Sequence, residues 1–303
     1  MYPVEAELRQ GQEQTWGIKS HEVVLGVKVF PLVFGMAAYS ALGKEDQDPV
    51  TGFFPASHGN DASELALLHN AIELGYNFFD TAEAYGDSEV LLGQVLKHYP
   101  RSNFVIATKV GIRPNPDIRG SIRKSVERLG TVPDILFVHD RWQDQMGEDL
   151  DDCLGALDEA VDQGYAREIG ISNFQPHELD TAISRLKHKP LFYQAKINLV
   201  NPRRDAIETL TICEENGMTF MASAALDRGG VLGGTVNPIA LEIKRRYEMT
   251  PAQVAIFAVR ALGSIPLVQT HNPDHLRENR EAFGFSMKQS DIDNLRKILL
   301  RQI

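Results

Sequence analysis

Four side chains of the kinds used in proton transfer lie at or just after short apolar segments of the sequence: Asp80, Tyr85, Lys109 and His139. Asp80, Lys109 and His139 each end a run of branched and aromatic residues, and Tyr85 follows Asp80 by five residues. Such runs are typical of strands covered on both faces, as in a parallel sheet. The carboxyl ends of parallel strands meet at one edge, so we expect these four side chains to lie close together.

The chemistry of this quartet follows from its residue types. A lysine at the end of an apolar strand needs a counter-ion, which Asp80 on the neighbouring strand can supply. An ammonium group beside Tyr85 favours the phenolate and lowers the pKa of the phenol from its usual value of about 10. Tyr85 can then act as a general acid or base while His139 orients a substrate oxygen. The quartet therefore predicts a metal-free proton-transfer site for a carbonyl or carbinol, in which a cofactor carries the electrons.

The rest of the chain indicates the fold that must position these residues. Eight short apolar segments alternate with longer amphipathic segments of helical period. Eight strand–helix units predict an α/β fold, a (β/α)8 TIM barrel. A doubly wound open sheet is the alternative, but no Gly-x-Gly-x-x-Gly follows the first expected strand. The expected strands are Leu32–Gly35, Asn77–Asp80, Phe104–Lys109, Ile135–His139, Glu168–Ser172, Phe192–Lys196, Thr219–Ser223 and Ile265–Val268.

Helices are expected between these strands, with shorter elements at both ends. A short hairpin over Trp16–Val29 precedes the first strand, and a helix at Asp291–Leu300 follows the last unit. Residues 1–15 are expected to be flexible, and residues 1–303 to form one domain. Ser40–Asn60, rich in Gly, Pro and Asp, is either a ligand-binding loop or a mobile insertion. The expected helices begin near Asp61 and cover Gly86–His98, Ile118–Leu129, Asp151–Gln163, Pro176–Leu186, Arg204–Asn216, Pro251–Leu262 and Pro273–Phe283.

Several motifs resemble those of one enzyme family. The stretch Gly75–Gly93 contains Asp-Thr-Ala, Tyr-Gly, Ser-Glu and Leu-Gly in that order, and it resembles the aldo-keto reductase signature. The segments Ala107–Lys109, Val138–His139 and Gly170–Phe174 are similar to further blocks of that family in the same order. The resemblance extends over Val33–Ala282, which is most of the chain.

The resemblance implies a barrel enzyme that moves a hydride between nicotinamide, as NADP(H) or NAD(H), and a small carbonyl or alcohol substrate. Tyr85 resembles the proton donor of the family, and Lys109 and Asp80 resemble the pair that tunes it. His139 is similar to the residue that orients the substrate.

The same resemblance implies which residues bind the cofactor. Ser172, Asn173 and Gln194 match the positions that hold the nicotinamide carboxamide. The other matches are Leu226, Arg228 and Gly229 for the pyrophosphate, and Glu278 and Asn279 for the adenine end.

Two cofactor-binding positions depart from the family pattern. Ser223 stands where the family often stacks an aromatic ring on nicotinamide. It is similar to the branch of sugar dehydrogenases that oxidise L-galactose or D-arabinose, as is the His139-Asp140 pair. Gln269 and His271 stand where the strand-eight loop normally has Gly and then Lys or Arg. A neutral imidazole replaces a guanidinium poorly at a phosphate, so the preference between NADP(H) and NAD(H) stays open.

A third departure concerns the substrate. The long C-terminal substrate loop of some aldo-keto reductases has no counterpart in this sequence. Substrate choice is therefore expected to depend on Ser40–Asn60, on Asp140–Asp149 with Trp142, and on Asp227–Asn237.

Composition excludes several classes of protein. The 303 residues carry 31 Lys and Arg against 41 Asp and Glu, a net charge of −10, which argues against a general nucleic-acid binder. Cys153 and Cys213 are too few and too far apart for a disulfide framework or a thiolate metal site. The polar N-terminal stretch has no signal-peptide core, and Val23–Tyr39 is too short and interrupted to span a bilayer. A cytoplasmic protein without membrane or nucleic-acid partners is expected.

Two other functions remain possible on the same residues. One is a regulatory subunit on this fold, similar to the potassium-channel β subunits, whose signature region also reads much like Asp-Thr-Ala-Glu-x-Tyr. The other is a redox-neutral isomerase or dehydratase that reuses the acid–base quartet.

Overall fold

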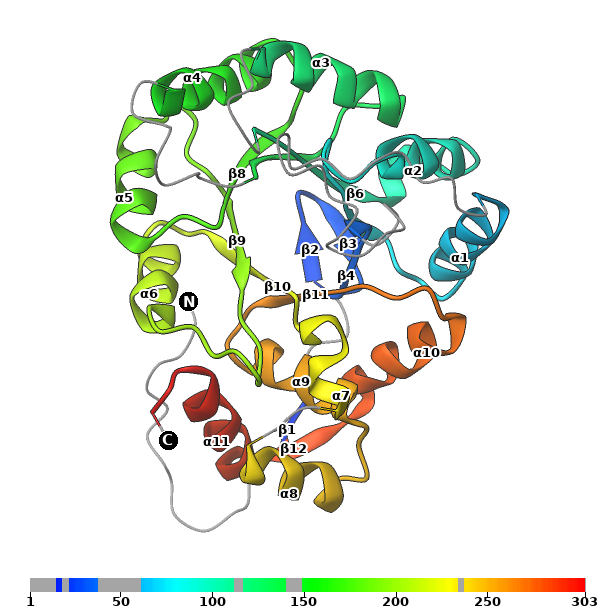
Figure 1. The fold of residues 1–303 in the computed structure, drawn as a ribbon, viewed down its shortest axis with the longest axis vertical. Coiled ribbons are helices and arrows are strands. Elements are labelled where there is room, and N and C mark those ends of the chain that lie inside the picture. Colours follow the sequence, from blue (N-terminus) through cyan, green and yellow to red (C-terminus); the bar gives the residue numbers. More distant parts are fainter. Residues whose placement is uncertain are drawn as a thin grey trace.

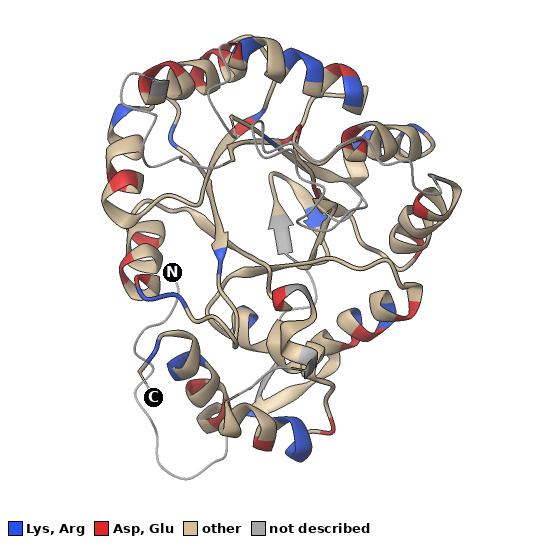
Figure 2. Ribbon diagram, in the orientation of Figure 1, with Lys and Arg blue, Asp and Glu red and all other residues tan. Residues whose placement is uncertain are grey.

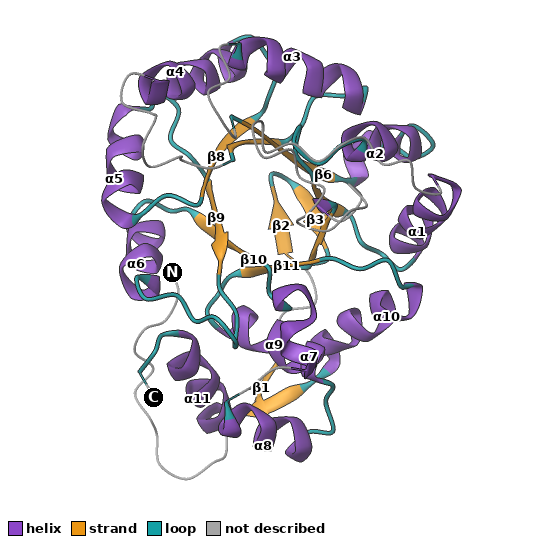
Figure 3. Ribbon diagram, viewed as in Figure 1, coloured by secondary structure: helices purple, strands orange, loops and turns teal. Residues whose placement is uncertain are grey.

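The computed structural model describes residues 15–17, 22–37, 61–111, 117–139, 149–233 and 237–302. Within these residues, parallel strands close into a barrel with helices as an outer ring (Figure 1, Figure 3). The order around the barrel is β10-β11-β4-β5-β6-β7-β8-β9, so successive barrel strands pair with each other and the last strand, β11, pairs with the first, β4. The TIM barrel and its eight predicted strands are confirmed. They are β4 (Val33–Gly35), β5 (Phe78–Asp80), β6 (Val105–Val110), β7 (Ile135–Val138), β8 (Glu168–Ser172), β9 (Phe192–Lys196), β10 (Thr219–Ser223) and β11 (Ile265–Val268).

The helices cover the outside of the barrel and carry most of the coloured charges in Figure 2, while the strands are largely uncharged. Two helices in the connection after β10, α7 and α8, were not expected from the sequence. The side chain of Asn237 caps α8 by accepting a hydrogen bond from the backbone nitrogen of Ile239. The helices are α1 (Asp61–Glu73), α2 (Ser88–Leu96), α3 (Ile118–Leu129), α4 (Asp149–Asp162), α5 (Pro176–Arg185), α6 (Ala206–Glu215), α7 (Gly230–Gly233), α8 (Pro238–Arg246), α9 (Pro251–Ala261), α10 (Pro273–Glu281) and α11 (Gln289–Leu299).

An antiparallel hairpin of β2 (Glu22–Val24) and β3 (Val27–Val29) closes the amino end of the barrel. Val24 and Val29 are buried in one apolar cluster with the first residues of several barrel strands, such as Val105 of β6. The open end of the barrel is therefore the carboxyl end, where ligand sites of this fold lie.

The expected hairpin over Trp16–Val29 was too long. β1 (Thr15–Gly17) does not join β2 and β3 but pairs antiparallel with β12 (Ser286–Lys288), outside the barrel. Residues 1–14, Ser40–Asn60, Asp140 and Trp142 lie outside the described residues. In the described part of the chain, no helix is long and apolar enough to cross a membrane.

Candidate active site

Lys109 and Asp80 form a buried ion pair between the neighbouring strands β6 and β5. Nζ of Lys109 donates to Oδ2 of Asp80 at 2.5 Å and to the backbone carbonyl of Thr81 at 2.8 Å. Burial alone would lower the pKa of Lys109, but Asp80 and Tyr85 raise that pKa above its usual range. The site therefore holds a charged ammonium group at pH 7.

Tyr85 and His139 face each other beside this ion pair. Oη of Tyr85 lies 3.2 Å from Nε2 of His139, and the two rings meet edge to face with centroids 5.3 Å apart. Nζ of Lys109 lies 4.9 Å from the centroid of the Tyr85 ring. Burial and then the charge of Lys109 lower the pKa of His139 well below its usual value, so the imidazole is neutral at pH 7. The structure thus brings together all four residues of the predicted quartet.

A tight turn presents Tyr85 to the site. The backbone nitrogen of Tyr85 donates to the carbonyl of Ala82 at 3.0 Å, and that of Ser88 donates to the carbonyl of Tyr85 at 3.1 Å. Gly86, with φ of 55°, adopts the left-handed conformation that favours glycine and leads the chain into α2. The Tyr85 backbone is therefore fixed on both sides.

Three polar residues predicted to bind nicotinamide lie next to the quartet. The side-chain amide of Asn173 donates to Oγ of Ser172 and to the carbonyl of His139, each at 3.0 Å. Asn173 has φ of 63°, a strained left-handed conformation of the kind that clusters at functional sites. Gln194 accepts a hydrogen bond from the Asn173 backbone and donates from Nε2 to Oδ1 of Asp80 at 2.8 Å. Through these side-chain and backbone hydrogen bonds, the three residues are connected to the quartet.

The sequence did not predict a second lysine at a strand end, Lys196. Its Nζ lies 2.7 Å from Oδ1 of Asp227 in the loop after β10, which also contains the predicted residues Leu226 and Gly229. Asn198 and Asn201 donate to the same carboxylate at 3.3 Å and 2.9 Å. This cluster ties the loop after β9 to the loop after β10. A cation at the end of an apolar strand was the signal that identified Lys109, and the same signal marks Lys196.

The predicted adenosine residues lie in the segment from β11 into α10. Gln269 directly follows β11, and His271 is exposed in the loop. Glu278 and Asn279 belong to α10. Asn279 is buried, and its Nδ2 has no hydrogen-bond partner among the described residues. A buried donor without a partner is costly, so this amide fits a group that accepts a hydrogen bond there.

The side chain of Arg228 is not described, so its predicted contact with a pyrophosphate is not tested by geometry. Ser223 ends β10, where it stands in register with Lys196 of β9. The described residues contain no group of three or more His, Cys, Asp or Glu side chains that would hold a metal ion.

The quartet places the hydroxyl of Tyr85 beside a charged ammonium group and a neutral imidazole. This arrangement can move a proton at Oη of Tyr85.

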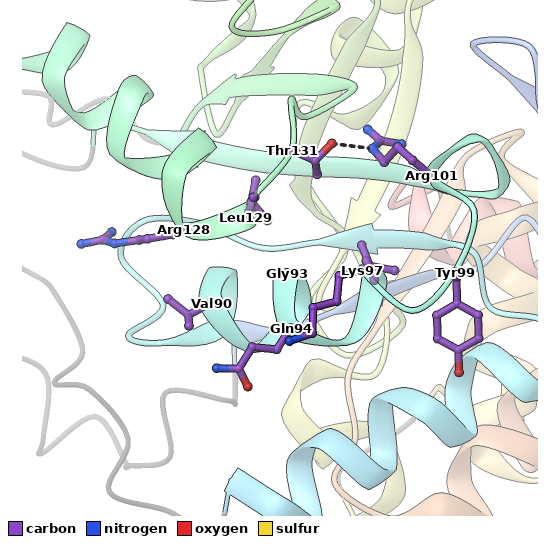
Figure 4. Close-up of a pocket in the computed structure, with 11 residues that line it drawn as sticks. Val90, Gly93, Gln94, Lys97, Tyr99, Arg101, Arg128, Leu129 and Thr131 are labelled. Carbon is purple, nitrogen blue, oxygen red and sulfur yellow. Dashed lines mark hydrogen bonds between the residues drawn. The ribbon is translucent and has the colours of Figure 1, made fainter.

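A hollow of about 470 Å³ lies outside the barrel, between the C-terminal ends of α2 and α3 (Figure 4). Gly93, Lys97, Arg101, Arg128 and Thr131 are among its lining residues, and Arg101 donates to the Thr131 hydroxyl at 3.0 Å. Helices of this fold run antiparallel to the strands, so this hollow faces the closed, amino end of the barrel. It is separate from the quartet.

Comparison with known proteins gives a consistent family match. The model of the aldo/keto reductase family matches residues 51–300. An aldo-keto reductase from Mycolicibacterium vanbaalenii is 28% identical over 262 residues, covering 81% of this chain and 86% of the relative. The 2,5-diketo-D-gluconic acid reductase B from a Corynebacterium species is 30% identical over 234 residues, covering 76% and 82%.

Solved structures give the same fold. A thermostable aldo-keto reductase in complex with the inhibitor epalrestat has a TM-score of 0.78 and 26% identity, covering 92% of this chain and 99% of that one. An aldo/keto reductase from Klebsiella pneumoniae, in complex with NADP and acetate, has a TM-score of 0.70 at 19% identity, covering 90% and 92%. These relatives are named as reductases, and the similarity to sugar dehydrogenases, based on Ser223, stays a prediction.

Proposed function

This chain belongs to the aldo/keto reductase family, whose members are NAD(P)-dependent oxidoreductases of carbonyl compounds, and we propose that Tyr85 is its proton donor. The observation that carries the proposal is the position of the Tyr85 hydroxyl, 3.2 Å from Nε2 of a neutral His139 and beside a buried ammonium group. A phenol hydroxyl can act as a general acid, and the ammonium group of Lys109 beside the ring can stabilise the phenolate that remains.

A nicotinamide cofactor, when bound, would supply the hydride that the carbonyl carbon receives. Tyr85 gives its Oη proton to the carbonyl oxygen, so that an alcohol forms. The ammonium of Lys109 stabilises the phenolate that remains, and Asp80 keeps that ammonium charged and in place. His139 orients the substrate oxygen through Nε2. In alcohol oxidation the phenolate of Tyr85 takes the proton back.

We also propose how the chain holds the cofactor. Ser172, Asn173 and Gln194 lie beside the quartet and bind the carboxamide, for which Oε1 of Gln194 can accept while Nε2 remains bonded to Asp80. The pyrophosphate is contacted by Ser223 and by the loop that contains Leu226, Arg228 and Gly229. Gln269, His271, Glu278 and Asn279 contact the adenosine, where the unpartnered Nδ2 of Asn279 donates to the ring.

We propose either NADPH or NADH as the cofactor. The Klebsiella relative binds NADP, which favours NADPH as the first candidate. Against this, the loop after β11 has His271 where a Lys or Arg is usual, and its nearest arginine, Arg277, is paired with Asp274 at 3.3 Å. Separate fluorescence titrations with NADPH and NADH decide between them.

The proposed substrate is an aldehyde, a ketone or a sugar hemiacetal. The Corynebacterium relative is named for a diketo sugar acid, so sugar-derived carbonyls are the first substrates to test. We further propose that residues 1–303 act as one domain around the barrel. A cytoplasmic location stays a prediction.

The test measures how much cofactor is oxidised for each product molecule formed. The purified protein is incubated with a carbonyl panel and either cofactor, and product is compared with the absorbance lost at the nicotinamide wavelength. One cofactor oxidised per product supports the proposal. Product without cofactor loss identifies an isomerase or dehydratase instead. No turnover on any substrate, together with co-purification of a membrane protein, identifies a regulatory subunit.

A further inference from the structure

Two buried side chains at the start of α2 form hydrogen bonds with the threonines next to Asp80 and Lys109 in the chain. Oγ of Ser88 lies 2.6 Å from Oγ1 of Thr81, which directly follows β5. Oγ1 of Thr108 in β6 donates to Oε1 of Glu89 at 2.6 Å. All four side chains are completely inaccessible to solvent. The first turn of α2 therefore fastens both strands from outside the barrel.

The bond between Thr108 and Glu89 bears directly on Lys109. Side chains alternate along a strand, so Thr108 points to the helices while Lys109 points into the barrel. The backbone carbonyl of Lys109 accepts a hydrogen bond from the nitrogen of Glu83 at 3.1 Å, which ties the loop carrying Tyr85 to the same strand residue. The position of Thr108 therefore bears both on Lys109, the next residue of the strand, and on the loop that carries Tyr85.

Burial of the Glu89 carboxyl group costs desolvation free energy. Burial raises the pKa of Glu89, and the hydrogen bond from Thr108 and the charge of Arg128 counter this effect. Arg128 reaches from the last turn of α3, with NH1 3.5 Å from Oε2 of Glu89. An apolar side chain would pack here without this desolvation penalty, so a packing role alone does not account for the glutamate.

A second carboxyl group faces the same space. Burial, and then the charge of Glu89, raise the pKa of Glu83, while Ser121, the Gly111 backbone and Arg128 lower it. Oε1 of Glu83 accepts from the nitrogen of Gly111, just past the end of β6, at 3.0 Å. Strand β6 is thus held by carboxyl groups at Thr108 and at Gly111, on either side of Lys109.

We propose that Glu89 is a positioning residue for the acid–base quartet: through its hydrogen bond to Thr108 it holds Lys109 at the distance from Tyr85 that proton donation needs. The inference rests on the proposed function, because it assumes that Tyr85 is the proton donor. It is independent of the identity of the substrate and of the cofactor.

The central test compares Thr108→Val with Thr108→Ser. Valine keeps the shape of threonine but removes the donor to Glu89, whereas serine keeps the hydroxyl. The first readout is the ionisation of the Tyr85 phenol, taken as the ultraviolet difference between each protein and its Tyr85→Phe counterpart. Among the described residues, Lys109 and His139 lie beside this phenol, so a displaced ammonium raises the ionisation midpoint, by about one pH unit. Thr108→Ser returns the midpoint to the wild-type value.

The second readout is kinetic. Thr108→Val is expected to lower kcat by roughly 10- to 100-fold, because small displacements of a catalytic group have effects of this size. KM and the cofactor Kd stay within about twofold, since Thr108 contacts neither ligand in this arrangement. Thr209→Val is the matched control: Thr209 is a buried threonine of α6 whose hydroxyl has no hydrogen-bond partner among the described residues.

A double-mutant cycle tests the pair itself. Glu89→Met, alone or combined with Thr108→Val, is expected to lower kcat no further than Thr108→Val does alone, because one interaction is lost in each case. Additive losses would overturn the proposal, as would an unchanged phenol midpoint in Thr108→Val or an equal loss in Thr108→Ser.

The two proposals fail in different ways. The phenol titration needs neither substrate nor cofactor, so it reports on Glu89 and Thr108 even if no carbonyl is turned over. Absence of any cofactor-dependent turnover in the wild type would overturn the proposed function. A normal midpoint in Thr108→Val, with an active wild type, would overturn only the positioning role.

Discussion

Gln194 and Asp80 are hydrogen bonded across the interior of the barrel, with Nε2 of Gln194 2.8 Å from Oδ1 of Asp80. Their strands, β9 and β5, lie opposite each other in the closed order of eight. The other oxygen of Asp80 binds Lys109. One carboxylate thus connects the ion pair of the quartet to the residues proposed to hold the nicotinamide.

Asp80→Asn is expected to destabilise the fold and to lower kcat by at least about tenfold. The substitution leaves the ammonium of Lys109 buried without a counter-ion, and breaking such a pair by removing one partner typically costs about 3–5 kcal/mol. Urea denaturation measures the first effect, and the Lys109→Met/Asp80→Asn double variant should recover part of the stability. Asp162→Asn, which removes an exposed partner of Lys187, is the control and should change little. An equal loss of unfolding free energy in Asp80→Asn and Asp162→Asn would contradict the importance of burial.

Tyr85→Phe removes only the hydroxyl that is proposed to donate the proton. Loss of a general acid typically lowers turnover about 10²- to 10⁴-fold, so kcat should fall within this range. The cofactor Kd, measured by fluorescence, should stay within about twofold because the ring remains. Turnover equal to that of the wild type would remove Tyr85 from the mechanism.

His139 makes stability depend on pH. Its pKa is lowered in the folded protein, so below a pH of about 6.5 the unfolded chain takes up a proton that the folded protein does not. Stability therefore falls as the pH falls, and between pH 7 and 5.5 His139 should account for about 1 kcal/mol of the loss. Urea denaturation of the wild type and of His139→Gln at both values measures this difference. A larger loss in the variant than in the wild type would contradict the sign.

His271→Arg is expected to raise the affinity for NADPH by about tenfold or more and to leave that for NADH nearly unchanged. A guanidinium group forms paired, charge-assisted hydrogen bonds with a phosphate, which an imidazole does not. Fluorescence titration measures both constants. His98→Arg adds the same charge at the end of α2, near the closed end of the barrel, and should affect neither. A similar gain for both cofactors would place His271 away from the 2′-phosphate.

The barrel was predictable because its strands are buried on both faces. Such strands appear in a sequence as short apolar runs, and a polar residue such as Asp80 or Lys109 at the end of one is conspicuous. The pairing of Trp16 with Met287 was not predictable, because two short segments far apart in the chain meet only through the tertiary fold. Helix α8 was missed: Asn237, which caps it, was placed at the end of the expected substrate-selecting region Asp227–Asn237.

The quartet was predictable from residue type, but the buried hydrogen bond between Thr108 and Glu89 beside it was not. Thr108 has an ordinary residue type for a strand, and nothing in a single sequence shows that its hydroxyl meets Glu89. Glu89 itself, in the first turn of an amphipathic helix, has the type and place of a solvent-exposed residue, yet it is completely buried. The partner that makes burial tolerable comes from α3, and only the packing of α2 on α3 brings it within reach.

The closure of the barrel has a consequence for synthesis of the protein. The first strand of the barrel, β4, pairs with β5 on one side and with β11 on the other. During translation one edge of β4 therefore has no barrel strand to pair with until residues 265–268 have left the ribosome. Unpaired edges of nascent sheets are sites of aggregation, so the growing chain carries this risk for most of its length. Chains truncated before β11 should accordingly be insoluble rather than partly active.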